Sequence, residues 1–209
     1  MNESVIVSPD CIEKAAHELV QVEPKFLQPY QLLAPLPLRL KPQGFASLLQ
    51  AIMGQQVSVA SANAIWDRLI KSGLTDEAEM RKADEDNLRN CGLSRQKIKY
   101  AKALADAQLD YAAFPNQESR DVIKTLTSVT GIGTWTAEIY AKFSLGRADI
   151  FAAGDLALQE GAKMLFALPE RPNEKQMRHM ATAWSPYRSV AARLLWAYYK
   201  HQKQREGIT

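Results

Sequence analysis

Cysteine is scarce in this sequence: Cys11 and Cys91 are the only two among 209 residues. Two cysteines cannot build a disulfide framework, a four-cysteine zinc site or an iron–sulfur cluster. The three histidines, His17, His179 and His201, show no metal-ligand spacing either. We therefore expect a protein of a reducing, cytoplasmic compartment that has no transition-metal centre.

Long apolar runs are missing too. No run approaches the roughly 18 residues that would cross a bilayer, so we expect no membrane partner. The first residues, MNESVIVSPDC, lack the basic stretch and apolar core of a secretory signal. With 46% hydrophobic and 23% charged residues, the composition is typical of a globular protein and excludes a disordered chain.

The net charge of +3 is small, but its distribution along the chain is uneven. From residue 163 onward, nine Lys or Arg residues stand against three Asp or Glu residues. A second basic cluster spans residues 89–102, directly after an acidic stretch at 76–86. This segregation suits a one-sided contact with a polyanion, although solvated helix faces produce the same pattern.

Apolar residues recur at helical spacing through nearly the whole chain, and no alternating strand pattern stands out, so we expect an all-α fold of about ten helices. Five prolines between residues 24 and 42 predict an extended connector and a boundary. The candidate N-caps are Ser8 or Asp10, Ser58, Thr75 and Ser94. The expected helices cover residues 12–20, 45–53, 59–72, 75–90, 96–109, 120–127, 134–144, 156–166, 174–184 and 188–200.

The segment VTGIGTWTA, residues 129–137, lies between two expected helices. Gly131 and Gly133 allow a tight turn that leaves backbone N–H groups open to an anion, and the dipole of the next helix favours a phosphate there. Ile132 between them can anchor the turn in the core. A GxG pair alone is usually only a turn. Between two helices it is typical of a helix-hairpin-helix, which grips a DNA backbone without reading sequence.

Asp155 follows Trp135 by twenty residues and opens the next expected helix. An aspartate before an apolar run is an ordinary N-cap, and this position taken alone favours that role. Asp149, six residues earlier, could tune Asp155 but is more simply a loop carboxylate.

Three blocks occur in order: FASLLQAIMGQQVSVASANAI at 45–65, LTSVTGIGTWTAEIYAKF at 126–143 and ADIFAAGDLALQ at 148–159. Together they resemble the helix-hairpin-helix DNA glycosylase superfamily, specifically its DNA-3-methyladenine glycosylase II branch. WSPYRSVAARLLWAYY at 184–199 is similar to the last helix of that branch. The resemblance covers the chain from about Pro42 onward.

The resemblance implies two helical lobes with the active cleft between them. One lobe, residues 42–147, would carry a wedge loop and the helix-hairpin-helix. The second, discontinuous lobe would join residues 1–41 to residues 148–209. Larger relatives carry a β-rich domain before the helical core, and the stretch before Pro42 is too short for that domain.

The catalytic aspartate of this family falls on Asp155. A carboxylate there would stabilise the positive charge that develops on the deoxyribose, and would orient the attacking water. A base that is already cationic, such as 3-methyladenine, needs little protonation, so no dedicated general acid is expected. The resemblance thus implies base excision repair by flipping out and excising alkylated purines.

Two departures from relatives point to a monofunctional enzyme. Members that also cut the strand carry a lysine in the hairpin where this sequence has Trp135, and without that nucleophile no Schiff base forms. Iron–sulfur members need four clustered cysteines near the C-terminus, and this chain has none there. We therefore expect no strand-cleaving lyase activity.

A flat cationic base favours aromatic walls, because a cation–π contact contributes about 0.5–2 kcal/mol. By resemblance, Trp135 and Trp196 line the base pocket, although core packing is the alternative for both. The position four after Trp135 is aromatic in some relatives. Here it is Ile139, with Tyr140 beside it as the other candidate wall residue.

The resemblance also assigns DNA contacts. GQQVS, residues 54–58, is similar to the family's wedge loop, with Gln56 at the intercalating position beside Gln55; an ordinary polar loop is the alternative. The backbone amides expected to hold a phosphate are those of Gly131, Gly133 and Thr134.

Hairpin carbonyl oxygens in this family commonly hold a monovalent cation. The resemblance places them on Thr127, Val129 and Ile132, and no cofactor is otherwise expected. The expected partner is duplex DNA with a damaged base, bound by a monomer. Two alternatives stay open: a non-enzymatic protein that holds DNA through the hairpin alone, and a related glycosylase of different base preference.

Overall fold

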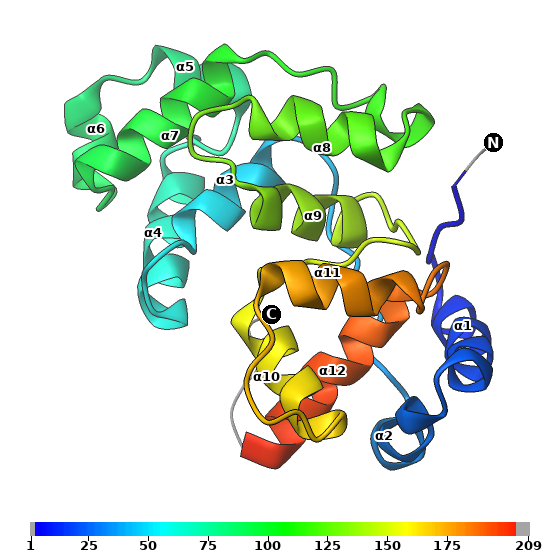
Figure 1. The fold of residues 1–209 in the computed structure, drawn as a ribbon. Coiled ribbons are helices and arrows are strands. Elements are labelled where there is room, and N and C mark those ends of the chain that lie inside the picture. The colour runs from blue at the N-terminus through cyan, green and yellow to red at the C-terminus, as the bar shows by residue number, and fades with distance from the viewer. Residues whose placement is uncertain (1–2, 204–209) are drawn as a thin grey trace. The chain divides into compact units, whose positions relative to one another are not determined.

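The computed structural model describes residues 3–203 and confirms the all-α fold (Figure 1). Within that range the chain forms twelve α-helices and two short 3-10 helices, and its only β feature is an isolated bridge between Val5 and Arg147. No helix of this range is long and apolar enough to span a bilayer. Arg205 and Glu206, which belong to the basic C-terminal part, lie outside the described residues.

The chain divides into two compact units. The hairpin unit is Lys41–Tyr140, and the aspartate unit joins the described residues up to Leu40 to those from Ala141 onward. The first boundary lies at the end of the proline-containing connector. The second falls inside α9 (Thr134–Phe143), before the boundary expected at residue 147.

In the hairpin unit, α7 is the central helix and packs against α3, α5 and α6. Leu48, Leu49 and Ile52 of α3 are fully buried at helical spacing, as the sequence pattern requires. The elements of this unit are α3 (Phe45–Met53), α4 (Val59–Lys71), α5 (Glu77–Lys82), α6 (Glu85–Asn90), α7 (Arg95–Asp106), η2 (Phe114–Asn116), α8 (Ser119–Thr127) and the first part of α9.

Short polar side chains start these helices. The hydroxyls of Ser58 and Ser94 accept backbone N–H groups at the starts of α4 and α7, which confirms both predicted caps. The single helix expected over residues 75–90 was wrong. Asp76 and Asp84 each accept backbone N–H groups, so each carboxylate starts a short helix of its own.

The aspartate unit is built around α12 (Arg188–Lys203), which packs most extensively on α10 (Leu156–Leu165) and also on α1 and α2. A Cβ on Gly161 of α10 would lie 2.7 Å from the carbonyl oxygen of Leu195, so glycine is what lets these two helices approach. The remaining elements are α1 (Pro9–Val22), η1 (Pro24–Phe26), α2 (Leu27–Leu33), the end of α9 and α11 (Glu174–Thr182).

The extended connector expected over residues 24–42 is only partly extended. Pro24 starts η1 and Pro29 lies in the first turn of α2, where a missing N–H removes no helical hydrogen bond. The chain is non-helical from Ala34 to Gly44. The expectation was therefore wrong for the first ten residues, because a proline in a first turn is compatible with a helix.

Candidate functional site

The hairpin joins α8 to α9 (Figure 1). Gly131 has a φ of +98°, and a Cβ there would lie 2.3 Å from Cγ of Tyr100, so only glycine fits without displacing that ring. Ile132 is buried, and its N–H donates back to a hairpin carbonyl oxygen over 3.0 Å. Gly133 and Thr134 are exposed where α9 begins, and the first N–H groups of a helix have no intrahelical acceptor. The turn therefore offers donors suited to a phosphate.

The expected wedge loop follows α3 and is attached to the hairpin. Gln55 Nε2 donates to the carbonyl oxygen of Gly131 over 3.1 Å and to Oγ1 of Thr136 over 3.5 Å. Gln56 is exposed and has a φ of +57°, a conformation that costs a non-glycine residue about 1–3 kcal/mol and clusters at functional sites. The two glutamines thus differ: Gln55 braces the hairpin, whereas Gln56 faces solvent.

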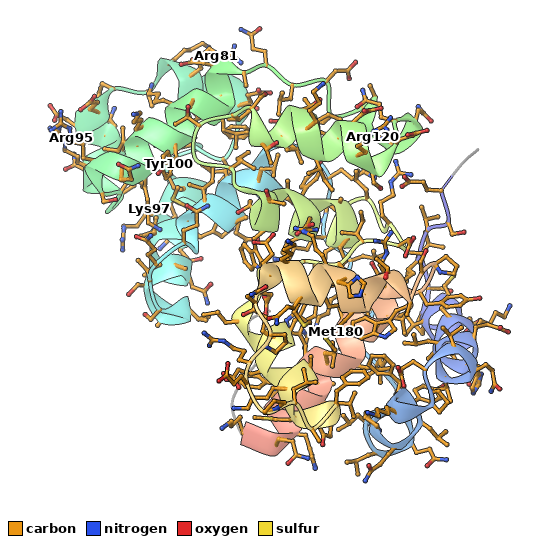
Figure 2. All side chains as sticks on the ribbon, in the orientation of Figure 1. Arg81, Arg95, Lys97, Tyr100, Arg120 and Met180 are labelled. Carbon is orange, nitrogen blue, oxygen red and sulfur yellow. The ribbon has the colours of Figure 1, made fainter. Side chains whose placement is uncertain are left out.

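Lys97 is a residue of this region that the sequence did not single out. It lies on α7 (Figure 2) and is only 8% exposed. Its Nζ donates to the carbonyl oxygens of Ile52, Met53 and Gln55, over 3.3 Å for Ile52 and 3.0 Å for Gln55. The carbonyls of Ile52 and Met53 end α3, where a cation also complements the helix dipole, and that of Gln55 belongs to the expected wedge loop. Lys97 therefore fixes the start of that loop. Burial lowers the pKa of Lys97 below its ordinary value.

Other members of the basic cluster at 89–102 are also used inside the hairpin unit. Lys102 donates to two backbone carbonyl oxygens, and Arg89 pairs with two exposed carboxylates of α6. Arg95 and Lys99 are exposed and have no ion pair within the described part of the chain. Three of the five basic residues at 89–102, Arg89, Lys97 and Lys102, are therefore engaged by groups of the hairpin unit itself.

Two of the aromatic residues expected around the base lie in the hairpin unit. The Tyr140 hydroxyl accepts the Gly44 N–H over 2.9 Å, and its ring packs edge-on against Phe114 with centroids 6.2 Å apart. Burial raises the pKa of Tyr140, and the hydrogen bond from Gly44 offsets part of that rise. Trp135 and Ile139 of α9 are half-buried. A pocket role for Tyr140 and Trp135 stays a prediction.

Asp155 is the N-cap of α10 and is 3% exposed. Its Oδ1 accepts the backbone N–H groups of Ala157 over 2.9 Å and Leu158 over 3.0 Å. The same oxygen accepts Nε1–H of Trp196, 41 residues further on, over 3.1 Å. The cap is therefore confirmed, but the bond from Trp196 is more than a cap requires. Three donors on one oxygen hold the carboxylate in a single orientation.

Trp196 of α12 is 5% exposed, and a buried cation lies against its ring. The ring stacks on Phe143, with centroids 5.7 Å apart and an interplanar angle of 24°. Nζ of the fully buried Lys142 lies 4.1 Å from the Trp196 centroid and 5.4 Å from the Phe143 centroid. These distances place the ammonium on the same side of Trp196 as Phe143. The protein thus supplies its own cation–π partner on that side.

Asp149 is the loop carboxylate that the sequence suggested as the simpler interpretation. Its Oδ1 accepts Nε–H of Arg188 over 2.6 Å, and its Oδ2 accepts Nη2–H of Arg188 over 2.8 Å and the Ser185 hydroxyl over 2.7 Å. Burial alone would raise the pKa of Asp149, but the hydrogen bonds from Arg188 and Ser185 bring it below its ordinary value. This ion pair fixes the loop that follows α9.

Comparison with known proteins identifies the family. The sequence model of the HhH-GPD superfamily of base excision DNA repair proteins matches residues 49–186, more than half of the chain. The chain therefore belongs to this superfamily, and the family expected from its motifs is confirmed.

Several individual relatives are named as 3-methyladenine glycosylases or glycosidases. "DNA-3-methyladenine glycosylase 1" of Schizosaccharomyces pombe is 31% identical over 166 residues, which cover 75% of this chain and 72% of the relative. A solved structure of a DNA-3-methyladenine glycosidase from Bacillus halodurans has a TM-score of 0.80 at 31% identity, over 98% of this chain and 95% of that one. The structure of S. pombe Mag1 with abasic DNA has a TM-score of 0.76 at 28% identity, over 91% of this chain and 97% of that one.

Proposed function

We propose that this chain is a monofunctional DNA glycosylase that excises alkylated purines in base excision repair. The observation that carries the proposal is the buried Asp155 carboxylate, held by three N–H donors, one of them from Trp196. Relatives named as 3-methyladenine glycosylases support the choice of substrate. The substrate is duplex DNA with a damaged base, and the protein acts as a monomer.

Asp155 acts on the sugar. The damaged nucleotide rotates out of the duplex, which costs a few kcal/mol and less where pairing is already weakened. As the glycosidic bond breaks, positive charge develops on the deoxyribose, and the fixed carboxylate stabilises it and orients the attacking water. A cationic alkylated purine leaves as a neutral base, so the reaction needs no dedicated general acid.

The resemblance assigns Trp135 and Trp196 each to a contact with the flipped base. Because the Lys142 ammonium already lies on one side of Trp196, a cationic base would use the opposite face. A ring anchored at its nitrogen by Asp155 keeps that face in one orientation.

The hairpin unit holds the DNA. The backbone amides of Gly131, Gly133 and Thr134 bind a phosphate without reading sequence. Gln56, exposed in a left-handed conformation, fills the gap that the flipped base leaves, and Gln55 ties that loop to the hairpin.

The carbonyl oxygens of Thr127, Val129 and Ile132 would hold a monovalent cation at the hairpin. Backbone carbonyl oxygens are suitable donors for a hard cation. Thr127 ends α8, so its carbonyl has no acceptor role within that helix. The Val129 carbonyl accepts the Ile132 N–H over 3.0 Å and keeps a second lone pair for a cation. When bound, the cation adds positive charge beside the phosphate.

Strand cleavage is not part of the proposed activity. Trp135 stands where strand-cutting relatives carry a lysine, so the hairpin offers no amine to form a Schiff base. Sodium borohydride should therefore trap no covalent complex with damaged DNA. A trapped adduct would overturn the monofunctional assignment.

The direct test is base release from duplexes that carry one methylated, deaminated or oxidised purine, measured under single-turnover conditions. We expect release from the methylated duplexes. Release confined to deaminated or oxidised bases would instead establish a glycosylase of different base preference. DNA binding without release of any base would establish a non-enzymatic DNA-binding protein.

A further inference from the structure

The aspartate unit contains a cavity of about 490 Å³ between the segment that follows α2 and the last turns of α12. Its volume lies in the range of small-molecule sites, roughly 300–1,000 Å³. Part of the wall is apolar, including Leu33 and Trp196. The rest is basic and consists of Arg39, Arg193, Lys200 and His201.

The positive charge around this cavity is not neutralised by the protein. No Asp or Glu is among the lining residues. Across residues 3–203, no ion pair involves Arg39, Arg193, Lys200 or His201. Elsewhere in the aspartate unit, Arg188 and Arg178 each have a carboxylate partner.

The unneutralised positive charge destabilises the folded protein most at Arg193, because this side chain is only 3% exposed. Nη1 donates to the carbonyl oxygen of Ser189 over 3.1 Å and Nη2 to that of Leu38 over 3.0 Å, but the buried Nε has no acceptor within the described residues. Burial first, and then the charge of Arg39, lower the pKa of Arg193 to about 10. A buried cation that faces another cation is stable only at a cost that a bound anion would remove.

Arg39 has a φ of +53°, which is unusual for a residue other than glycine. The neighbouring carbonyl, that of Leu38, is the one that Arg193 holds. The backbone is thus fixed in a strained turn that brings a second guanidinium to the cavity, and such strain is concentrated at ligand sites.

We propose that this cavity binds a phosphate group, with Arg39 and Lys200 at its rim and Arg193 at its base. Guanidinium groups match phosphate oxygens in geometry and charge. A backbone phosphate of DNA and the phosphate of a free nucleotide share this chemistry. Only the DNA source rests on the proposed function.

The first test is thermal unfolding of the full-length protein in inorganic phosphate, compared with chloride at equal ionic strength. Phosphate should raise Tm in the wild type, since a ligand of the folded state stabilises it. The double variant Arg39→Gln/Lys200→Gln should lose most of that rise. Lys14→Gln/Lys175→Gln, which removes two exposed charges of the same unit away from the cavity, should keep it. An equal phosphate effect in all three proteins, or none in the wild type, overturns the proposal.

The second test identifies the source of the phosphate. If DNA supplies it, the slope of log K against log salt for duplex binding should fall by about 0.7–0.9 for each phosphate that Arg39→Gln/Lys200→Gln no longer neutralises, and should not fall in the control variant. If the slope is unchanged but a 5′-mononucleotide stabilises the wild type and not the cavity variant, the phosphate site is supported and its ligand is a free nucleotide. Base release is measured in a separate assay. If the protein releases no base, the proposed function fails, but the phosphate and salt measurements still test the cavity.

Discussion

The two units offer opposite kinds of functional group. In the hairpin unit, three of the groups assigned to DNA are exposed: Gly133, Thr134 and the strained Gln56. In the aspartate unit, Asp155 and Trp196 are almost completely buried and bonded to each other. The difference fits the role that we propose for each unit. A phosphate backbone is held by donors that solvent can reach, whereas a developing charge is best stabilised by a carboxylate that cannot reorient.

The units are also braced by opposite charges. Lys97 places an ammonium on the carbonyl oxygens that end α3. Asp155 places a carboxylate on the N–H groups that start α10. Each charge complements the helix end it touches. In each unit, a substitution that removes the charge but keeps a side chain of similar size can therefore test what the charge contributes.

The largest expected effect is that of Asp155→Asn. Asparagine is as good an N-cap as aspartate, and its side-chain oxygen can still accept Nε1–H of Trp196, so the fold should persist. The negative charge is lost, and single-turnover release of a methylated base should fall by at least about 100-fold.

The control for that substitution is Asn173→Ala, which removes the capping box of α11 in the same unit. It should lower the free energy of unfolding by about 1 kcal/mol and leave base release near normal. Normal turnover by Asp155→Asn would show that the aspartate only caps a helix. The aspartate unit would then have no demonstrated catalytic group to compare with the DNA-holding groups of the hairpin unit.

The next effect is that of Lys97→Met in the hairpin unit. This change leaves the carbonyl oxygens of Ile52, Met53 and Gln55 without their charged donor, so the free energy of unfolding should fall by about 1.5–3 kcal/mol. Urea denaturation measures the change. Lys99→Met, an exposed position on the same helix, should have almost no effect. Equal effects of the two variants would show that Lys97 does not brace the wedge loop.

A pair of hairpin substitutions separates turn geometry from accessibility. Gly131→Ala combines a positive φ with a Cβ placed against Tyr100, and should cost at least about 1–3 kcal/mol of stability. A Cβ on Gly133 meets nothing within 4 Å, so Gly133→Ala should stay within about 0.5 kcal/mol of the wild type. Thermal unfolding measures both. If Gly133→Ala were the more damaging change, the strain assigned to Gly131 would be misplaced.

The hairpin could be predicted because its signals are local. Two glycines flanking Ile132 specify the turn. The start of α7 is equally local, because the Ser94 hydroxyl accepts a backbone N–H three residues further on. The single helix expected over 75–90 failed because Asp84 acts as a cap in the middle of an otherwise helical pattern. Cap and helix interior compete at such a residue, and local sequence does not decide between them.

The partners of the buried charges could not be predicted, because they depend on packing between distant segments. Helical spacing places Lys97 on the same face as Ala101 and Leu104, so the sequence separates it from the exposed Lys99. The carbonyl oxygens that Lys97 binds lie more than 40 residues away and could not be predicted. Likewise the bond from Trp196 to Asp155 joins residues 41 apart, so the position of Asp155 could suggest a cap but not this second partner. The role that we propose for Asp155 comes from the resemblance to a family, and the hydrogen bonds around it come from the structure.

The smallest expected effect comes from the Asp149–Arg188 ion pair of the aspartate unit. Its hydrogen bonds hold the pKa of Asp149 below the ordinary value, so the pair stabilises the folded protein above the unfolded pKa of about 3.9 and loses that contribution as pH falls further. At pH 7, Asp149→Asn should therefore lower stability by up to about 1 kcal/mol, and the difference in Tm from the wild type should shrink at pH 3. In the hairpin unit, Glu85→Gln breaks an exposed pair with Arg89 and should change Tm little at pH 7. A Tm difference for Asp149→Asn that is unchanged at pH 3 would show that the loop is held by packing and not by this charge.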